Sequence, residues 1–123
     1  MRVKIALIGK NAADLDPLVH EFGFTKVAAE EADVIVAYGG DGTMIGAEHV
    51  FPGIPKLGLR DSKVVQKCAR HADRDVLARL ARGEAPRARI MKLAADVHGR
   101  SLWGLNDVLL RNSDLRSAVR FSV

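Results

Sequence analysis

One short stretch of the sequence carries the residue types that phosphate chemistry requires. Residues 34–38 (VIVAY) form an apolar run that stops at residues 39–43 (GGDGT), and a segment of helical character follows. This order predicts a buried strand, a tight glycine turn and a helix whose first unpaired N–H groups face the turn. Those N–H groups and the helix dipole favour an anion. Because Asp41 places a carboxylate inside the turn, the same site is expected to bind a hydroxyl, a proton or a metal as well.

The segments that flank this glycine turn (residues 39–43) predict how it is held. Apolar runs predict buried strands, and apolar side chains spaced i, i+3, i+4 and i+7 predict amphipathic helices. The expected strands are residues 3–8, 24–28, 34–38 and 56–59, and the expected helices are residues 15–22, 43–50 and 61–83, the last most clearly from Asp73. Such alternation is typical of an α/β fold with a mostly parallel sheet and flanking helices.

A different pattern follows Pro86. Polar and apolar residues alternate over residues 90–97, residues 98–100 (HGR) resemble a hairpin turn, and further strands are expected at 102–110 and 117–123. This pattern predicts a short antiparallel β-meander. We therefore expect one domain over residues 1–84 and a second over residues 85–123. The last strand would present an open edge, so we expect either pairing with a second copy of the chain or a fragment of something longer.

The composition is that of a soluble globular protein, with 48% hydrophobic and 28% charged residues. The longest apolar runs reach five or six residues, whereas a helix that spans a bilayer needs about 20. Cys68 is the only cysteine in the sequence. No intrachain disulfide can therefore form, and a reducing, cytoplasmic location is expected.

The charges divide along the chain. Residues 14–48 hold eight Asp or Glu and one Lys, whereas residues 60–92 hold ten Lys or Arg and four Asp or Glu. The basic segment has two interpretations, a surface for nucleotide phosphates or another anionic partner and a solvated face. The side chains concerned are Arg60, Lys63, Lys67 and Arg70, while Asp61 and Ser62 are interpreted as loop residues. Few aromatic residues accompany them, which disfavours nucleic acid as a partner.

No metal site made by the protein itself is expected from the sequence. Histidines occur at positions 20, 49, 71 and 98, and their spacing relative to one another and to Cys68 matches no metal-ligand pattern. The two familiar phosphate loops, GxxxxGK[ST] and GxGxxG, are also absent from the sequence. The glycine turn therefore belongs to another kind of site.

Residues 39–43 (GGDGT) after a buried strand resemble the signature of the NAD kinase superfamily, which diacylglycerol-type lipid kinases share. A second motif favours the NAD kinase branch. Residues 104–111 (GLNDVLLR) resemble the Asn-Glu/Asp motif of NAD kinases, in the expected order and at about the expected distance. The resemblance covers the chain from about Val3 to Arg111. It implies an α/β nucleotide-binding domain over residues 1–84 and the start of an apparently truncated β-domain over residues 85–123.

The resemblance also implies an activity, the transfer of a phosphoryl group from ATP to the 2′-hydroxyl of NAD to give NADP. Asp41 would bind that hydroxyl and take its proton, and Mg²⁺ would accompany ATP. The residues that would shape the phosphate-approaching turn are Gly39, Gly40, Gly42 and Thr43, and those that would hydrogen-bond the adenine or ribose end of NAD are Asn106 and Asp107. Bare backbone amides beside a carboxylate suit a hydroxyl that reacts next to phosphates.

The sequence departs from the family pattern in two places. After the strand at 56–59 the family continues with Asn, glycines and Gly-Phe-Leu, whereas this chain has residues 58–63 (GLRDSK). Family members also continue into a further β-domain that closes the NAD pocket. We therefore expect the activity in a complete protein. The alternatives are a non-catalytic nucleotide-binding or regulatory module and a lipid-kinase-like protein.

Overall fold

The computed structural model describes residues 2–67, 71–109 and 113. The chain divides into two compact units, Met1–Pro86 and Arg87–Val123. This division falls at Pro86, next to the joint between residues 84 and 85 that the sequence indicates. None of the helices in the described ranges is long and apolar enough to cross a membrane.

The first unit is built on a parallel sheet of four strands in the order β2-β1-β3-β4. The strands are β1 (Lys4–Ile8), β2 (Thr25–Lys26), β3 (Val34–Gly39) and β4 (Lys56–Arg60). The helices are α1 (Asp16–Glu21), α2 (Asp41–Val50) and α3 (Asp73–Ala81), with short 3₁₀ helices η1 (Ala12–Leu15) and η2 (Ala29–Glu31). The α/β class and the parallel sheet predicted from the alternating pattern are confirmed.

Strand β3 is the central strand, and all six of its residues are buried. It pairs in parallel with β1 on one side, where Ile5 faces Val34, and with β4 on the other, where Ile35 faces Lys56. Both faces of such a strand are covered, which explains its continuous apolar sequence. The chain runs outward from β1 to β2 and, on the other side, outward from β3 to β4. Ligands of open parallel sheets bind at the carboxyl ends of the strands where the order diverges in this way.

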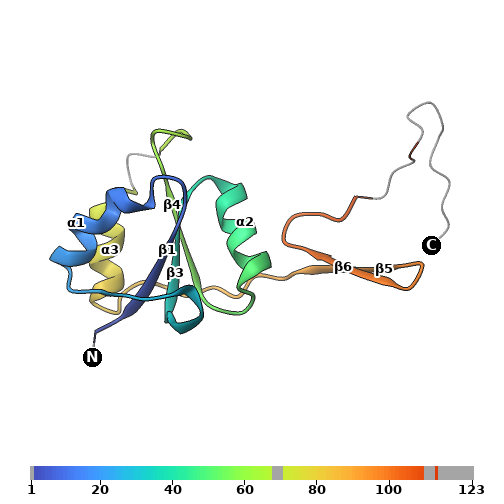
Figure 1. Ribbon diagram of the computed structural model, residues 1–123, viewed down its shortest axis with the longest axis horizontal. Coiled ribbons are helices and arrows are strands. Elements are labelled where there is room, and N and C mark those ends of the chain that lie inside the picture. The colour runs from blue at the N-terminus through green and yellow to red at the C-terminus, as the bar shows by residue number, and fades with distance from the viewer. Residues whose placement is uncertain (1, 68–70, 110–112, 114–123) are drawn as a thin grey trace. The chain divides into compact units, whose positions relative to one another are not determined.

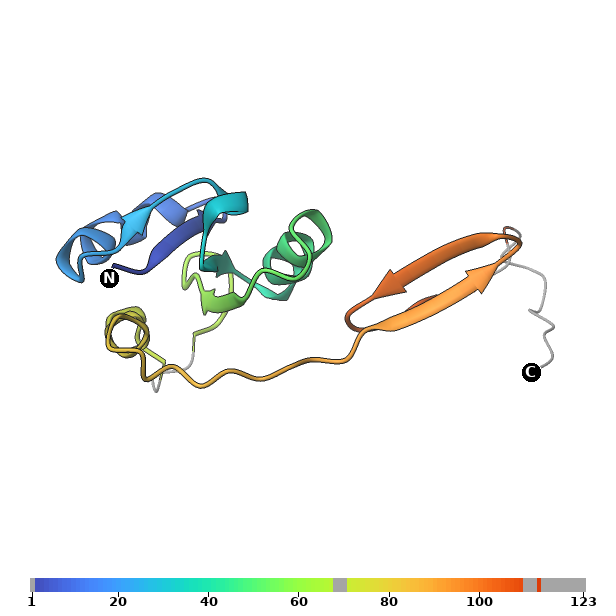
Figure 2. The same cartoon turned by 90° about the horizontal axis from the view of Figure 1, so that it is seen from below.

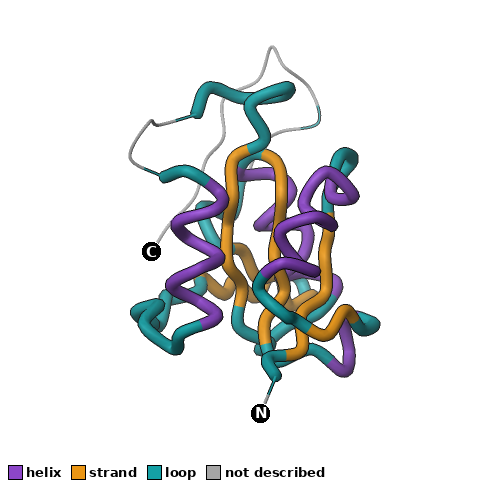
Figure 3. Tube along the Cα trace, turned by 90° about the vertical axis from the view of Figure 1, so that its left-hand side faces the viewer, coloured by secondary structure: helices purple, strands orange, loops and turns teal. Residues whose placement is uncertain are grey.

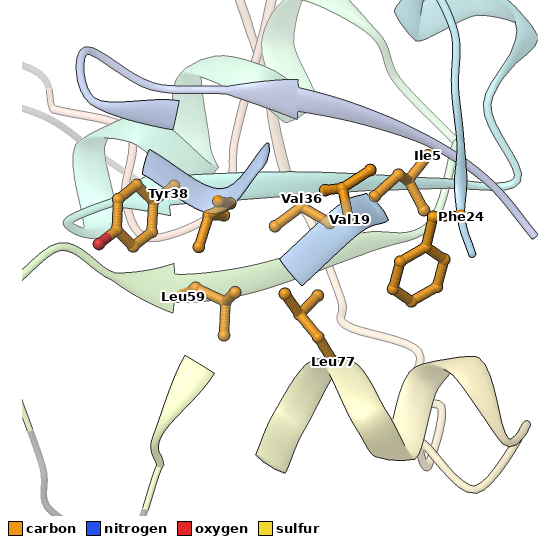
Figure 4. Packing of buried hydrophobic residues seen from close by; sticks show 8 residues of the cluster. Ile5, Val19, Phe24, Val36, Tyr38, Leu59 and Leu77 are labelled. Atoms are coloured by element: carbon orange, nitrogen blue, oxygen red, sulfur yellow. The ribbon is translucent and has the colours of Figure 1, made fainter. Parts of the chain in front are cut away.

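The helices form a layer on each face of the sheet. Helices α1 and α3 cover one face and α2 covers the other (Figure 1), and Figure 3 shows the molecule from the α1 and α3 side. Successive residues of a strand point to opposite faces. The core under α1 and α3 contains Ile5, Leu15, Val19, Phe24, Val36, Tyr38, Leu59 and Leu77 (Figure 4). The core under α2 contains Ala6, Ile35, Ala37 and Ala47, mostly small side chains that let α2 lie close to the sheet.

Two helix boundaries differ from the sequence prediction. Helix α2 begins at Asp41, two residues before the expected start at 43, because Gly40 is already in the extended N-cap conformation. Helix α3 begins at Asp73, which confirms the helical interpretation from that residue on. The interpretation is wrong for residues 61–67 and 71–72, which are not helical: residues 62–65 form a turn and bend, where the Asp61 carboxylate accepts a hydrogen bond from the Lys63 N–H at 3.0 Å and competes with helix formation.

The second unit contains an antiparallel hairpin of β5 (Leu93–Val97) and β6 (Arg100–Gly104), seen in Figure 2. His98 (φ 49°) and Gly99 (φ 73°) join the strands, and two positive φ values are what a type I′ hairpin turn requires. The predicted antiparallel pairing is thus confirmed for two strands, while the third, expected at 117–123, lies outside the described residues. The second strand ends at Gly104, earlier than the predicted 110. There the chain folds back, and a Cβ on Gly104 would lie 2.5 Å from the carbonyl oxygen of Asp107.

Candidate functional site

The glycine turn connects the carboxyl end of β3 to the start of α2. Gly39 is the last residue of β3, Gly40 is the N-cap with φ −106° and ψ −167°, and Asp41 is the first helical residue. The first intrahelical bond runs from the Met44 N–H to the Gly40 carbonyl at 3.4 Å. The N–H groups of the residues before Met44 have no partner within the helix. Because Asp41 lies in the first turn, its negative charge interacts favourably with the positive end of the helix dipole.

The three glycines of the turn face different surroundings. A Cβ on Gly39 would collide with the side chain of Thr43, and a Cβ on Gly40 would lie 3.1 Å from Cγ1 of Val65. A Cβ on Gly42 would meet no protein atom within 4 Å. Packing within the protein therefore explains glycine at the first two positions. The third position borders open space, where the absence of a side chain leaves room for a ligand.

A pocket of about 160 Å³ lies beside the turn, at the carboxyl ends of β3 and β4 and under the first turn of α2. It brings together two of the predicted glycines, the predicted catalytic carboxylate and the first residue of the basic segment. Its lining residues are Ala37, Gly39, Gly40, Asp41, Met44, Gly58, Leu59 and Arg60. Gly58 lets the Met44 side chain pack against β4 in the wall of the pocket, because a Cβ at position 58 would lie only 3.0 Å from the Met44 sulfur.

Asp41 and Arg60 face each other at the mouth of this pocket. Nη2 of Arg60 lies 3.5 Å from Oδ1 of Asp41, and the two side chains are 51% and 82% exposed, respectively. A pair that is this long and this exposed contributes little to stability. Both groups therefore remain accessible to a ligand, one as a cation for phosphate and the other as an acceptor for a hydroxyl. The sequence allows Arg60 to be either a phosphate contact or part of a solvated face, and the structure places it at the rim of the pocket.

Two lysines of the basic segment, Lys63 and Lys67, have carboxylate partners in the structure. Nζ of Lys63 lies 2.6 Å from Oδ2 of Asp14, which raises the pKa of Lys63. Nζ of Lys67 contacts Asp73, donates to the Arg60 carbonyl at 3.0 Å and lies 5.9 Å from the centre of the Tyr38 ring. The Lys67 pair is mostly buried, whereas the Lys63 side chain stays 64% exposed and differs from Arg60 in its nearer partner and its place outside the pocket. Arg70 lies outside the described residues.

The burial and hydrogen bonding of Asp61, which lies near the site, are not predicted by the sequence. Asp61 is only 1% exposed, whereas the sequence predicts an ordinary loop residue directly after a strand. Its Oδ2 accepts a hydrogen bond from Nδ2 of Asn11 at 2.6 Å, and its Oδ1 accepts one from the Lys63 N–H at 3.0 Å. The Asn11 bond is the main cause that lowers the pKa of Asp61, with help from Lys63 and against the opposing effect of burial. The only signal in the sequence is its position at the carboxyl end of a parallel strand.

Asn106 and Asp107 belong to the second unit. Both are exposed and lie in the bend that follows β6. Neighbouring residues of a regular strand point to opposite faces, but this constraint does not apply here because the strand has ended at Gly104. Their contact with NAD stays a prediction.

The side chains of the described residues form no group of three or more His, Cys, Asp or Glu that could hold a metal ion. A comparison with protein-family models finds no match to the chain, and a comparison with curated proteins finds none either. The fold and site thus define an α/β protein with a glycine turn, an accessible carboxylate and a guanidinium at the carboxyl ends of its parallel strands.

Proposed function

We propose that the chain is the nucleotide-binding part of an NAD kinase-like phosphotransferase, which transfers a phosphoryl group from ATP to the 2′-hydroxyl of NAD. The observation that carries this proposal is the position of Asp41. Its carboxylate stands at the carboxyl end of the central parallel strand, in the first turn of α2 and 3.5 Å from Arg60. An acceptor for a proton thus lies next to donors for phosphate, which is the arrangement that phosphoryl transfer to a hydroxyl requires.

Each group at the turn has a part in the proposed reaction. Asp41 accepts the proton of the 2′-hydroxyl as that oxygen bonds to the terminal phosphorus of ATP, and ADP leaves with the electrons of the broken P–O bond. The unpaired N–H groups at the start of α2 and the guanidinium of Arg60 hold the phosphate oxygens. Gly42, which borders open space, allows the phosphates to approach the backbone.

Mg²⁺ fits this arrangement as a companion of ATP. It usually keeps several waters and is bound by substrate phosphates and one or two carboxylates, and Asp41 is a carboxylate of that kind. When bound, it would neutralise phosphate charge.

Asn106 and Asp107 of the second unit would contact the adenine or ribose end of NAD. The pocket of about 160 Å³ is smaller than the roughly 300–1,000 Å³ of typical ligand sites, so the proposal assigns activity to a complete protein that adds further walls.

The same pocket supports a second candidate, a nucleotide-binding module without catalysis. Asp41 is 82% exposed, whereas a general base works best where water is excluded. Isothermal titration calorimetry with ATP and with NAD separates the candidates. Binding without product formation supports the module, and absence of binding by both nucleotides contradicts both candidates.

The direct test is incubation of the complete protein, with the further walls of the site, with Mg²⁺-ATP and NAD, and NADP is measured by an NADP-specific dehydrogenase. We expect Asp41→Asn to lower kcat by about 100-fold or more, the usual contribution of a general base, while NAD binding is retained. Asp33→Asn is a matched control, because Asp33 accepts a hydrogen bond from the Lys4 N–H at 2.8 Å, outside the site. Equal NADP formation by wild-type protein and Asp41→Asn would contradict the proposal.

A further inference from the structure

We propose that Asp61 is a positioning residue that holds Arg60 and the glycine turn in the geometry needed for phosphoryl transfer. The inference rests on the proposed function for its consequence in catalysis, and on the hydrogen bonds of Asp61 for its structural basis. Asp61 does not line the pocket, so it acts through its neighbours.

Every polar group of Asp61 has a partner. Its N–H donates to the Gly39 carbonyl at 3.2 Å, and its own carbonyl accepts from the N–H groups of Val64 at 3.0 Å and Val65 at 2.9 Å. Its carboxylate accepts from the Asn11 amide at 2.6 Å and from the Lys63 N–H at 3.0 Å. A buried carboxylate that receives such donors is expected to have one well-defined conformation.

These bonds join the carboxyl ends of three strands. Asn11 follows β1, Gly39 ends β3, and Asp61 itself follows β4. The three strands are neighbours in the sheet, and the gap between β1 and β3 is where the strand order diverges. Asp61 thus links all the loops that border the expected ligand site.

Two of its linked segments touch the groups of the proposed reaction. The turn closed by the Asp61 carbonyl places Val65 against Gly40, where a Cβ would lie only 3.1 Å from Cγ1 of Val65. The residue before Asp61 is Arg60, whose guanidinium lies 3.5 Å from the Asp41 carboxylate. The backbone bonds of residue 61 do not depend on its side chain, so the carboxylate acts through its bonds to Asn11 and the Lys63 N–H, which hold the turn between Arg60 and Val65 in place.

Both hydrogen bonds require a carboxylate at position 61, because each of its two oxygens accepts one of them. An amide has one acceptor and one donor, so Asp61→Asn loses either the bond from Asn11 or the bond from the Lys63 N–H. Displacement of reacting groups by about 1 Å can lower a rate by roughly 100-fold. The loss is therefore expected mainly in kcat, with a smaller change in the KM for NAD.

The experiment reverses the polarity of the Asn11–Asp61 bond. In the double variant Asn11→Asp with Asp61→Asn, the new amide donates to the new carboxylate, and its oxygen accepts from the Lys63 N–H. Both single variants, the double variant and the control Asp33→Asn are compared by the backbone amide resonances of residues 39–43, by calorimetric affinity for ADP, and by kcat and KM. Measurements are made at a temperature where each variant is folded, and Asn11→Ala replaces Asp61→Asn if that variant does not fold.

We expect Asp61→Asn to shift the amide resonances of residues 39–43, to weaken ADP binding and to lower kcat by about tenfold to 100-fold, with substantial recovery in the double variant. Asp33→Asn should leave all three unchanged. A lower melting temperature with unchanged resonances and kcat, or no recovery in the double variant, would overturn the positioning role. Absence of NADP formation by the complete wild-type protein overturns the proposed function instead, and the resonances and ADP affinity then decide the positioning role by the same criteria.

Discussion

Helix α2 and strand β4 carry an ion pair at each of their two ends. At one end Glu48, in the last turn of α2, contacts Lys56, the first residue of β4, and the side chains are 12% and 5% exposed. At the other end Asp41, the first residue of α2, lies 3.5 Å from Arg60, the last residue of β4, and both side chains are more than half exposed. The same two elements thus join closely at one end and remain open at the other.

This difference indicates that the buried pair stabilises the fold and that the exposed pair is available to a ligand. The Lys56 ammonium also donates to the Phe51 carbonyl, and Glu48 accepts from the Gly53 N–H at 3.1 Å, so the closed end is fully hydrogen-bonded. The open end borders the glycine turn and the pocket. Parallel sheets place ligand sites at the carboxyl ends of their strands, and the open pair occupies that edge. We therefore expect changes at the closed end to affect folding and changes at the open end to affect binding.

The largest effect is expected from Lys56→Met at the closed end. This change removes the Lys56 ammonium from a buried ion pair with Glu48, and the loss of one partner of such a pair costs about 3–5 kcal/mol. Chemical denaturation monitored by circular dichroism measures the loss. Nucleotide affinity of the folded fraction should be unchanged. A loss below about 1 kcal/mol would show that the closed end does not stabilise the fold.

The glycines of the turn offer a second contrast. Gly39→Ala forces its methyl group against Thr43, and such overpacking costs about 1–3 kcal/mol, part of which Thr43→Ala should restore. Gly42→Ala meets no protein atom and should leave stability unchanged or raise it by up to about 1 kcal/mol. Only Gly42→Ala should weaken ADP binding without a loss of stability. Thermal unfolding and calorimetry on the two variants decide this, and equal destabilisation by both would contradict the difference in their surroundings.

Arg60→Ala tests the open end directly. Because its pair with Asp41 is long and exposed, stability should change by less than about 1 kcal/mol. The affinity for ATP should fall by roughly tenfold, since a charged hydrogen bond to phosphate is lost, and wild-type binding should weaken more steeply with salt than binding by the variant. Lys63→Ala is the matched control, because Lys63 pairs with Asp14. An equal loss of ATP affinity in Arg60→Ala and Lys63→Ala would contradict a specific phosphate contact by Arg60.

The smallest effect is expected in acid. The pKa of Asp61 is lowered in the folded protein from its ordinary value near 3.8, first of all by the Asn11 hydrogen bond. The carboxylate therefore contributes stability at pH values above about 4, and this contribution is lost as the pH falls through the folded pKa. Denaturation curves between pH 6 and about 2.5 should show a shallower acid dependence for Asp61→Asn than for the wild type. Parallel curves would show that Asp61 titrates as it does in the unfolded chain.

Much of the fold follows from short-range patterns that a sequence displays openly. The apolar run of residues 34–38 predicts the central strand, because a strand covered on both faces needs no polar residues. The repeat over residues 15–22 predicts the helix that became η1 and α1. The sequence pattern predicts the start of α2 two residues late because Asp41 resembles a turn residue, whereas Gly40 serves as the N-cap and makes Asp41 the first residue of the helix.

The candidate site was only partly predictable for a physical reason. The glycine turn, Asp41 and the possible phosphate contact at Arg60 are adjacent to strands that the sequence identifies, so their common edge could be inferred. The burial of Asp61 depends on Asn11, 50 residues away in the sequence, and no local pattern reports it. The same holds for Lys63 and its partner Asp14, 49 residues apart. Interactions of this range exist only once the strands are ordered in the sheet.

The sequence by itself determined the alternation of strands and helices, the glycine turn after the central strand and the carboxylate within it, because each depends on the periodicity or conformational freedom of adjacent residues. Only the tertiary structure decided which ion pair between α2 and β4 is buried and which is exposed to solvent. Each pair joins a carboxylate of α2 to a cation of β4, Glu48 to Lys56 and Asp41 to Arg60, yet one pair is buried and the other is exposed. Burial at one end and exposure beside a pocket at the other are consequences of how α2 packs on the sheet, and that packing is a property of the assembled layers.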